Sequence, residues 1–194
     1  MAPKLRYLQV AALHANNIDQ GFLATLGVPF LALMYRAIDE SGDSVLLTEE
    51  PNGRVIAFVS GGIGMGPIYR RMLCRPLALA WALLPSLLRP ARVKRILDIV
   101  RYGQQVPSAL VPLPEAELLS IAVDPLARGR GVAEKLYRRL EVHFRERGKP
   151  AFRITVGDSL APAHRFYCRM GAQPVARTQV HAGEESLIYL QVLD

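Results

Sequence analysis

The chain has few of the residues that build covalent or metal cross-links. Its 194 residues include two cysteines, Cys74 and Cys168, which stand far apart in the sequence. No cluster of cysteine and histidine has the spacing of metal ligands, so we predict no metal site. No signal-peptide pattern opens the chain either. We therefore expect free thiols and a cytoplasmic setting.

Long hydrophobic runs and aromatic clusters are also absent. Within residues 70–101 the longest uncharged stretch, Pro76 to Leu88, covers 13 residues and contains prolines, whereas a membrane-spanning helix needs about 20 apolar residues. Aromatic residues make up 7% of the chain, and none interrupts its one arginine–glycine run. That run lacks the stacking side chains of single-stranded nucleic-acid sites, so we expect no nucleic-acid partner.

Acidic residues are scarce in one region. Between Arg70 and Arg101 there are eight basic residues and a single acid, Asp98, and the net charge of +7 in this segment equals that of the whole chain. Three interpretations remain open. The segment lies on an anionic membrane surface, or it folds as a lid over an anionic acceptor, or it is a helical hairpin that completes the core with solvated arginines.

Apolar spacing and turn residues predict alternating strands and helices. Strands are expected at Lys4–Val10, Val45–Thr48, Arg54–Ser60, Glu117–Val123, Phe152–Val156, Pro174–Val180 and Leu187–Val192. Helices are expected at His14–Leu26, Val28–Ile38, Val132–Arg147 and Ala161–Met170, with two or three short ones within Ile68–Tyr102. Gly61 to Pro67 reads as a flexible break. The order indicates one α/β domain over residues 1–194 with a mixed sheet.

The run from Arg128 to Ala133 (RGRGVA) is the most informative motif. It joins a predicted strand to a predicted amphipathic helix. Glycines let consecutive backbone N–H groups turn toward one point, and a helix N-terminus favours an anion there. Arg128 and Arg130 add full positive charge. This pattern predicts a phosphate-binding loop.

The motif, R-x-x-G-x-A, resembles the acetyl-CoA pyrophosphate loop of the GNAT N-acetyltransferase superfamily. The strand before it and the segment Ala163 to Gly171, similar to the family's A-x-x-[FL]-Y-x-x-x-G helix, extend the resemblance over about residues 117–172. It implies a GNAT-like α/β fold: a mixed sheet of six to seven strands flanked by helices. A basic helical insertion, about residues 68–105, would lie between the third and fourth strands.

The resemblance also implies a site and a reaction. An amine would attack the acetyl-CoA thioester directly, through a tetrahedral intermediate and without an acyl-enzyme. Tyr167 would protonate the leaving thiolate, and Glu117 or water would take the proton of the amine. The residues implied in donor binding are Ile121, Ala122, Val123, Arg128, Gly129, Arg130, Gly131, Val132, Ala133, Ser159 and Phe166.

The acceptor is less defined by the sequence. The segment from Gly21 to Tyr35 shows a softer resemblance to GNAT proteins of bacterial cell-surface polysaccharide biosynthesis. This resemblance suggests that the acceptor is an amino sugar on a nucleotide or lipid carrier. The alternatives are a protein or peptide amine, or a non-catalytic CoA-binding adaptor held at the membrane surface by residues 70–101. His14 is a candidate acceptor contact. A homodimer, frequent in the family, and a location at the inner face of the membrane are further expectations.

Overall fold

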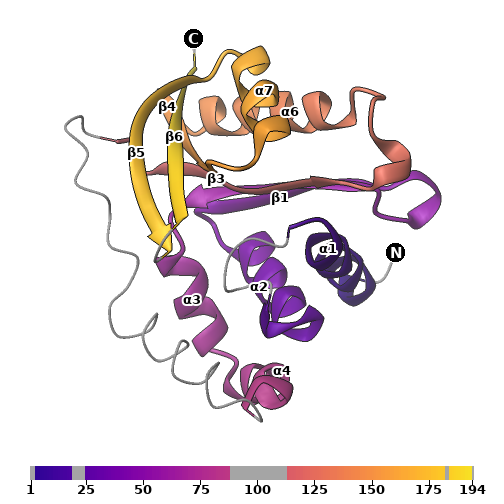
Figure 1. The fold of residues 1–194 in the computed structure, drawn as a ribbon. Coiled ribbons are helices and arrows are strands. Elements are labelled where there is room, and N and C mark those ends of the chain that lie inside the picture. The colour runs from indigo at the N-terminus through magenta and orange to yellow at the C-terminus, as the bar shows by residue number, and fades with distance from the viewer. Residues whose placement is uncertain (1–2, 19–24, 88–112, 182–183, 194) are drawn as a thin grey trace.

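A single mixed sheet forms the centre of the molecule (Figure 1). The structure is a computed structural model, which describes residues 3–18, 25–87, 113–181 and 184–193. The strands are β1 (Ser44–Glu49), β2 (Ala57–Ile63), β3 (Ala116–Val123), β4 (Ala151–Gly157), β5 (Gln173–His181) and β6 (Glu184–Val192). Their order is β1-β2-β3-β4-β6-β5, and only the β3–β4 pair is parallel. The predicted α/β class and mixed sheet are confirmed.

Helices cover both faces of the sheet (Figure 1). One face carries α1 (Pro3–Asn17), α2 (Val28–Glu40), α3 (Gly66–Leu73) and α4 (Pro76–Leu87), and the other carries α6 (Val132–Glu146) and α7 (Ala161–Met170). Short 3-10 turns stand at Pro51–Gly53, between the antiparallel strands β1 and β2, and at Pro125–Ala127.

The predicted first strand, Lys4–Val10, is wrong because this segment belongs to α1. Its buried residues Tyr7, Val10, Ala11 and His14 follow the i, i+3, i+4, i+7 spacing of a helix face. His14 therefore lies in the last turn of α1 and does not open a helix. The loss of this strand leaves six described strands. Consequently the insertion follows β2 and precedes β3, the second and third strands, and not the third and fourth.

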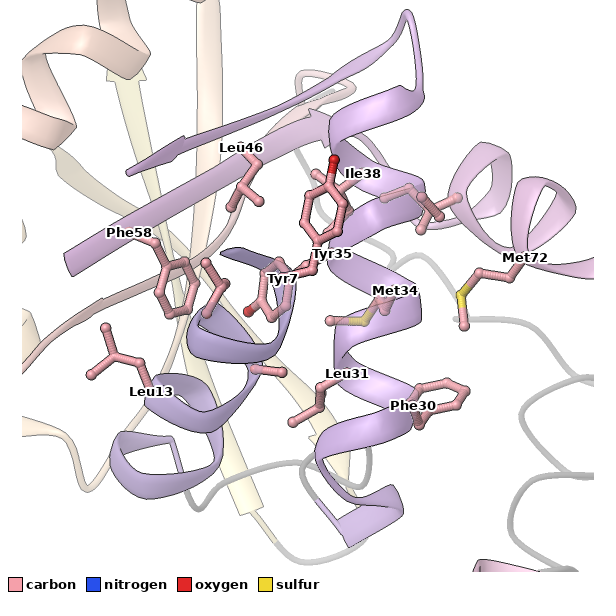
Figure 2. Close-up of a cluster of buried hydrophobic side chains, with 14 of the residues drawn as sticks. Tyr7, Leu13, Phe30, Leu31, Met34, Tyr35, Ile38, Leu46, Phe58 and Met72 are labelled. Atoms are coloured by element: carbon pink, nitrogen blue, oxygen red, sulfur yellow. The ribbon is translucent and has the colours of Figure 1, made fainter. Parts of the chain in front are cut away.

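The core between the sheet and the α1–α4 side is shown in Figure 2. Tyr35 of α2 packs edge-on against Phe58 of β2, with ring centroids 5.0 Å apart, and the hydroxyl of Tyr7 of α1 donates to Asp39 of α2 at 2.8 Å. The second helix, predicted as Val28–Ile38, is confirmed and runs to Glu40. Its buried face is Phe30, Leu31, Met34, Tyr35, Ala37 and Ile38.

The predicted flexible break from Gly61 to Pro67 is wrong in its first residues. Gly61 and Gly62 lie inside the buried strand β2 and not in a flexible break. A Cβ atom on Gly61 would stand 2.7 Å from Leu140 Cδ1 and 2.9 Å from Phe144 Cζ, both on α6. The missing side chain thus lets α6 approach the sheet closely, as a glycine in a strand interior often does.

The insertion begins as predicted, with short helices. The helix α3 ends before Pro76, and α4 packs on α2 through Leu79, Ala82 and Leu83. Pro85 lies within α4 and does not end a helix. The rest of the predicted helical segment, from residue 88 on, lies outside the described residues.

Candidate active site

Strands β3 and β4 pair only at their first residues. The parallel pairing joins Glu117 to Arg153 and Leu118 to Ile154, and no later pair follows. On the other edge of β3, the partner of Ser60 is Ser120, whereas the partner of Gly61 is Leu118, so Leu119 is an extra residue. Such a β-bulge bends a strand. The two neighbouring strands separate beyond Leu118, and backbone groups of β3 face the opening.

The glycine loop connects the end of β3 to α6. Gly129 and Gly131 have left-handed φ angles of 75° and 72°, and a Cβ atom at either position would meet no atom within 4 Å. Backbone conformation, and not crowding, is therefore the reason for glycine at these positions. Gly131 is also the N-cap residue of α6, which begins without a side-chain cap. This leaves backbone amides of the first turn for an anion.

Arg128 fixes the start of the loop. Its Nε donates to the Val123 carbonyl oxygen at 3.2 Å, and its Nη2 donates to Asn17 Oδ1 at 2.6 Å. Asn17 is the last residue of α1, so Arg128 ties the glycine loop to the helix on the opposite side of the cleft. Its guanidinium is therefore partly committed to protein contacts, and the loop amides remain the main groups for phosphate.

A cleft of about 920 Å³ runs from this loop to the separated strands β3 and β4. Volumes of this order are typical of small-molecule sites. Nine of the eleven residues predicted to bind the donor line it, namely Ile121, Ala122, Val123, Arg128, Gly129, Gly131, Val132, Ala133 and Phe166. The other two do not: Arg130 and Ser159 are exposed outside the lining.

Tyr167 stands where α7 meets the cleft. Its side chain lines the cleft, although it is only 5% exposed, and its ring packs among Tyr137, Phe166 and Tyr189. Burial raises the pKa of Tyr167 well above its usual value of 10. The phenol is therefore neutral and able to donate a proton throughout the physiological pH range.

Glu117 lies at the start of β3, on the α1–α4 side of the sheet. Arg153 Nη2 stands 2.9 Å from one carboxylate oxygen, and Thr155 Oγ1 donates to the other at 3.2 Å. Among the described residues, the partners of Glu117 are thus Arg153 and Thr155 of β4. Glu117 does not belong to the cleft lining.

His14 is not placed to contact an acceptor, because it is buried and lies outside the cleft lining. Its Nδ1 stands 2.6 Å from the hydroxyl oxygen of Tyr35, and its ring stacks on Phe58. Burial lowers the pKa of His14 to about 4. Burial also raises the pKa of Tyr35, and a hydrogen bond from Ser120 opposes this effect.

Tyr35 thus hydrogen-bonds to His14 and lies beside Ser120, a residue that lines the cleft. Sequence reasoning used Tyr35 only within the softer resemblance and assigned no role to the Ser120 side chain. The three residues come from α1, α2 and β3, so no local pattern could have linked them.

Among the described residues, no group of three or more His, Cys, Asp or Glu side chains is arranged to hold a metal ion. Cys74 and Cys168 are both exposed free thiols.

Comparisons with known proteins agree with this geometry. Residues 15–172 match the model of the Acetyltransferase (GNAT) family. No curated protein matches the chain. The fold is similar to solved structures of an N-acetyltransferase from Staphylococcus aureus Mu50, with 15% identity, coverage of 98% of this chain and 94% of that one, and a TM-score of 0.60.

Two further structures are similar in fold. Ard1 from Thermoplasma volcanium has 14% identity, coverage of 100% of this chain and 95% of that one, and a TM-score of 0.59. The ribosomal-protein-S18-alanine N-acetyltransferase from Escherichia coli has 16% identity, coverage of 96% and 88%, and a TM-score of 0.54. At these identities the likeness concerns the fold, whereas the family match covers most of the chain. With its bulged strand, its glycine loop and that match, this chain belongs to the GNAT family of acetyltransferases.

Proposed function

We propose that this protein transfers an acetyl group from acetyl-CoA to a primary amine by direct attack. The observation that carries the proposal is one continuous cleft that joins the glycine loop, the separated strands and Tyr167. An anion cradle, an extended strand edge and a neutral proton donor are the three groups that a CoA thioester needs.

The residues present fit the donor. Left-handed Gly129 and Gly131 and the uncapped start of α6 provide amides for the pyrophosphate. Ala133 is a small residue in the first turn of α6, where a larger side chain would narrow the cleft. The free edge of β3 from Ser120 to Val123 provides peptide groups for the pantetheine arm. When bound, acetyl-CoA supplies the activated acetyl thioester, and the rest of the chemistry is proton movement by the chain.

Two residues would move those protons. The Tyr167 hydroxyl, kept neutral by burial, would donate its proton to the departing sulfur. Glu117 or a water molecule would accept the proton that the attacking amine loses. Because Arg153 and Thr155 already bind both carboxylate oxygens of Glu117, a water-mediated route suits its geometry better than direct contact.

For the acceptor we propose an amino sugar on an anionic nucleotide or lipid carrier. The support is the charge of the segment from Arg70 to Arg101, which holds the whole net charge of +7. A phosphate-bearing acceptor is attracted by such a segment, whereas a basic peptide is repelled. A protein or peptide amine is the second candidate, and a catalytically idle CoA-binding protein is the third.

Release of the CoA thiol from acetyl-CoA, measured against a panel of amines, tests the proposal. The panel contains nucleotide-linked amino sugars, lipid-linked amino sugars, polyamines, aminoglycosides and basic N-terminal peptides. We expect amine-dependent release with the carrier-linked amino sugars. Release with peptides alone would replace this acceptor class by protein amines. No thiol release with any amine, while acetyl-CoA still binds, would refute the proposed acetyl transfer.

A further inference from the structure

The helix α4 exposes an apolar face at the surface. Leu77, Trp81 and Leu84 are 87%, 75% and 51% exposed, and their spacing of four and three residues places them on one side of the helix. Leu73, at the end of α3, is 65% exposed. The sequence of α4, PLALAWALLPSL, contains no charged residue.

The opposite side of α4 is already used by the fold. Leu79, Ala82 and Leu83 pack against the core that α1 and α2 form with the sheet. The helix α4 is therefore apolar on both sides, although only the side toward the core is covered by other residues. Surface helices normally turn a polar face to solvent, and large exposed apolar side chains gathered on one helix face mark an interaction surface.

The flanks of this face are basic. On α3, Arg70 and Arg71 are exposed. Glu40 contacts Arg71 at 3.8 Å, but it is held more closely by Arg36 and Arg75, each at 2.8 Å. One carboxylate thus faces several guanidinium groups, and positive charge remains in excess on α3, which ends shortly before α4 begins.

We propose that the face formed by Leu73, Leu77, Trp81 and Leu84, with Arg70 and Arg71 beside it, binds an anionic lipid membrane. Apolar side chains that enter the headgroup region next to arginines are the features of a helix that lies in the membrane interface. Tryptophan is enriched at that depth. No helix among the described residues is long and apolar enough to cross a bilayer.

A second copy of the chain is a less suitable occupant. A two-fold dimer through α4 places the same surface of each copy against the other. The basic flanks of both copies would then be brought together and would repel each other. An anionic membrane would instead attract the same basic residues. The inference is independent of donor binding, since α4 lies on the opposite side of the sheet from α6 and α7 (Figure 1).

Trp81 is the only tryptophan of the chain, so its fluorescence reports directly on this face. The experiment adds vesicles of phosphatidylglycerol and phosphatidylcholine, or of phosphatidylcholine alone, to the full-length protein. We expect a blue shift of Trp81 emission with the anionic vesicles, and binding about tenfold tighter than to phosphatidylcholine, weakening as salt is added. Co-sedimentation with the vesicles measures the binding separately.

Three variants locate the contact. Leu77→Ser with Leu84→Ser keeps Trp81 and removes exposed apolar groups only, so it should fold normally and lose most binding. Arg70→Ser with Arg71→Ser should weaken binding to anionic vesicles, while Glu40 retains Arg36 and Arg75 as partners. The control is Val142→Ser, an equally conservative change at an exposed position of α6, which should bind like the unchanged protein. Thermal unfolding checks the fold of each variant.

Several results would overturn the proposal. The proposal is contradicted if the Trp81 emission wavelength does not change with anionic vesicles, or if the protein binds both vesicle types equally. So does full binding by the Leu77/Leu84 variant. A blue shift that grows with protein concentration in the absence of lipid would assign the face to a second copy instead.

Discussion

Burial keeps two titratable side chains neutral on opposite sides of the sheet, with different consequences. It raises the pKa of Tyr167 and lowers that of His14 to about 4. Neutral Tyr167 keeps a proton that it can donate into the cleft. Neutral His14 has a ring nitrogen that accepts from Tyr35 or donates to it, 2.6 Å away, so its role is to hold structure.

Replacement of Tyr167 by phenylalanine should lower turnover by about tenfold or more, because the proton donor for the sulfur is lost. Acetyl-CoA affinity, measured by calorimetry, should change little. Tyr137→Phe is the matched control: its hydroxyl donates to Gln191 Oε1 at 3.0 Å, away from the cleft. The control should lose stability and keep its turnover. An unchanged turnover number in Tyr167→Phe would remove this residue from the mechanism.

His14 should make stability depend on pH. Its folded pKa of about 4 lies below the ordinary value of 6.5, so the unfolded chain binds a proton more readily. The contribution is complete above pH 6.5 and is lost as pH falls toward 4, by about 3 kcal/mol.

The measurement is the free energy of unfolding at pH 7 and pH 4 for the unchanged protein and for His14→Asn. Asparagine does not titrate, and its side-chain amide reaches the position of Nδ1. The advantage of the unchanged protein over the variant should therefore shrink by about 3 kcal/mol between the two pH values. A constant difference would show that His14 does not titrate in this way.

At the scale of elements, the connection from β3 to α6 is the unit for which we propose phosphate binding. Gly131→Glu should abolish acetyl-CoA binding, because a carboxylate would occupy the start of α6, where the phosphate is expected. Gly148→Glu supplies the control. Gly148 follows the other end of the same helix, with a left-handed φ of 66° and no atom within 4 Å of its Cβ position.

Both glutamates therefore carry the same backbone strain, and only one of them stands at the anion cradle. Calorimetry should show loss of binding for Gly131→Glu and near-normal affinity for Gly148→Glu. Equal affinities in the two variants would refute the loop assignment.

Elements defined by local signals were predictable from the sequence. The strand, glycine loop and helix around Arg128 follow one another within the chain, and the helix from Ala161 to Met170 was predicted with its exact bounds. Lys4–Val10 was misread because alternating apolar residues over seven positions fit a short strand as well as a helix face. Gly61 was misread as part of a flexible break because its close contact with Leu140 and Phe144 is a tertiary contact, which the local sequence does not show.

For the whole molecule, the parts of the site that escaped prediction are those that join distant segments. The bond from Arg128 to Asn17 connects the glycine loop to α1, and the bond between His14 and Tyr35 connects α1 to α2. Periodicity and motifs describe neighbours in sequence, whereas these contacts depend on how the layers stack. The lining of the cleft by Gly129 and Gly131 was predictable, since it requires only the local turn.

The two cores share no residue, although one sheet supports both. Phe58 of β2 belongs to the core beside α1 and α2, while its neighbours Ala57 and Val59 belong to the core beneath α6 and α7. Substitutions on opposite faces should then act nearly additively. In evolution, such a partition would let the α1–α4 layer diverge while the layer of α6 and α7, which follows the glycine loop, stays constant, so that one ancestral scaffold can change on a single face.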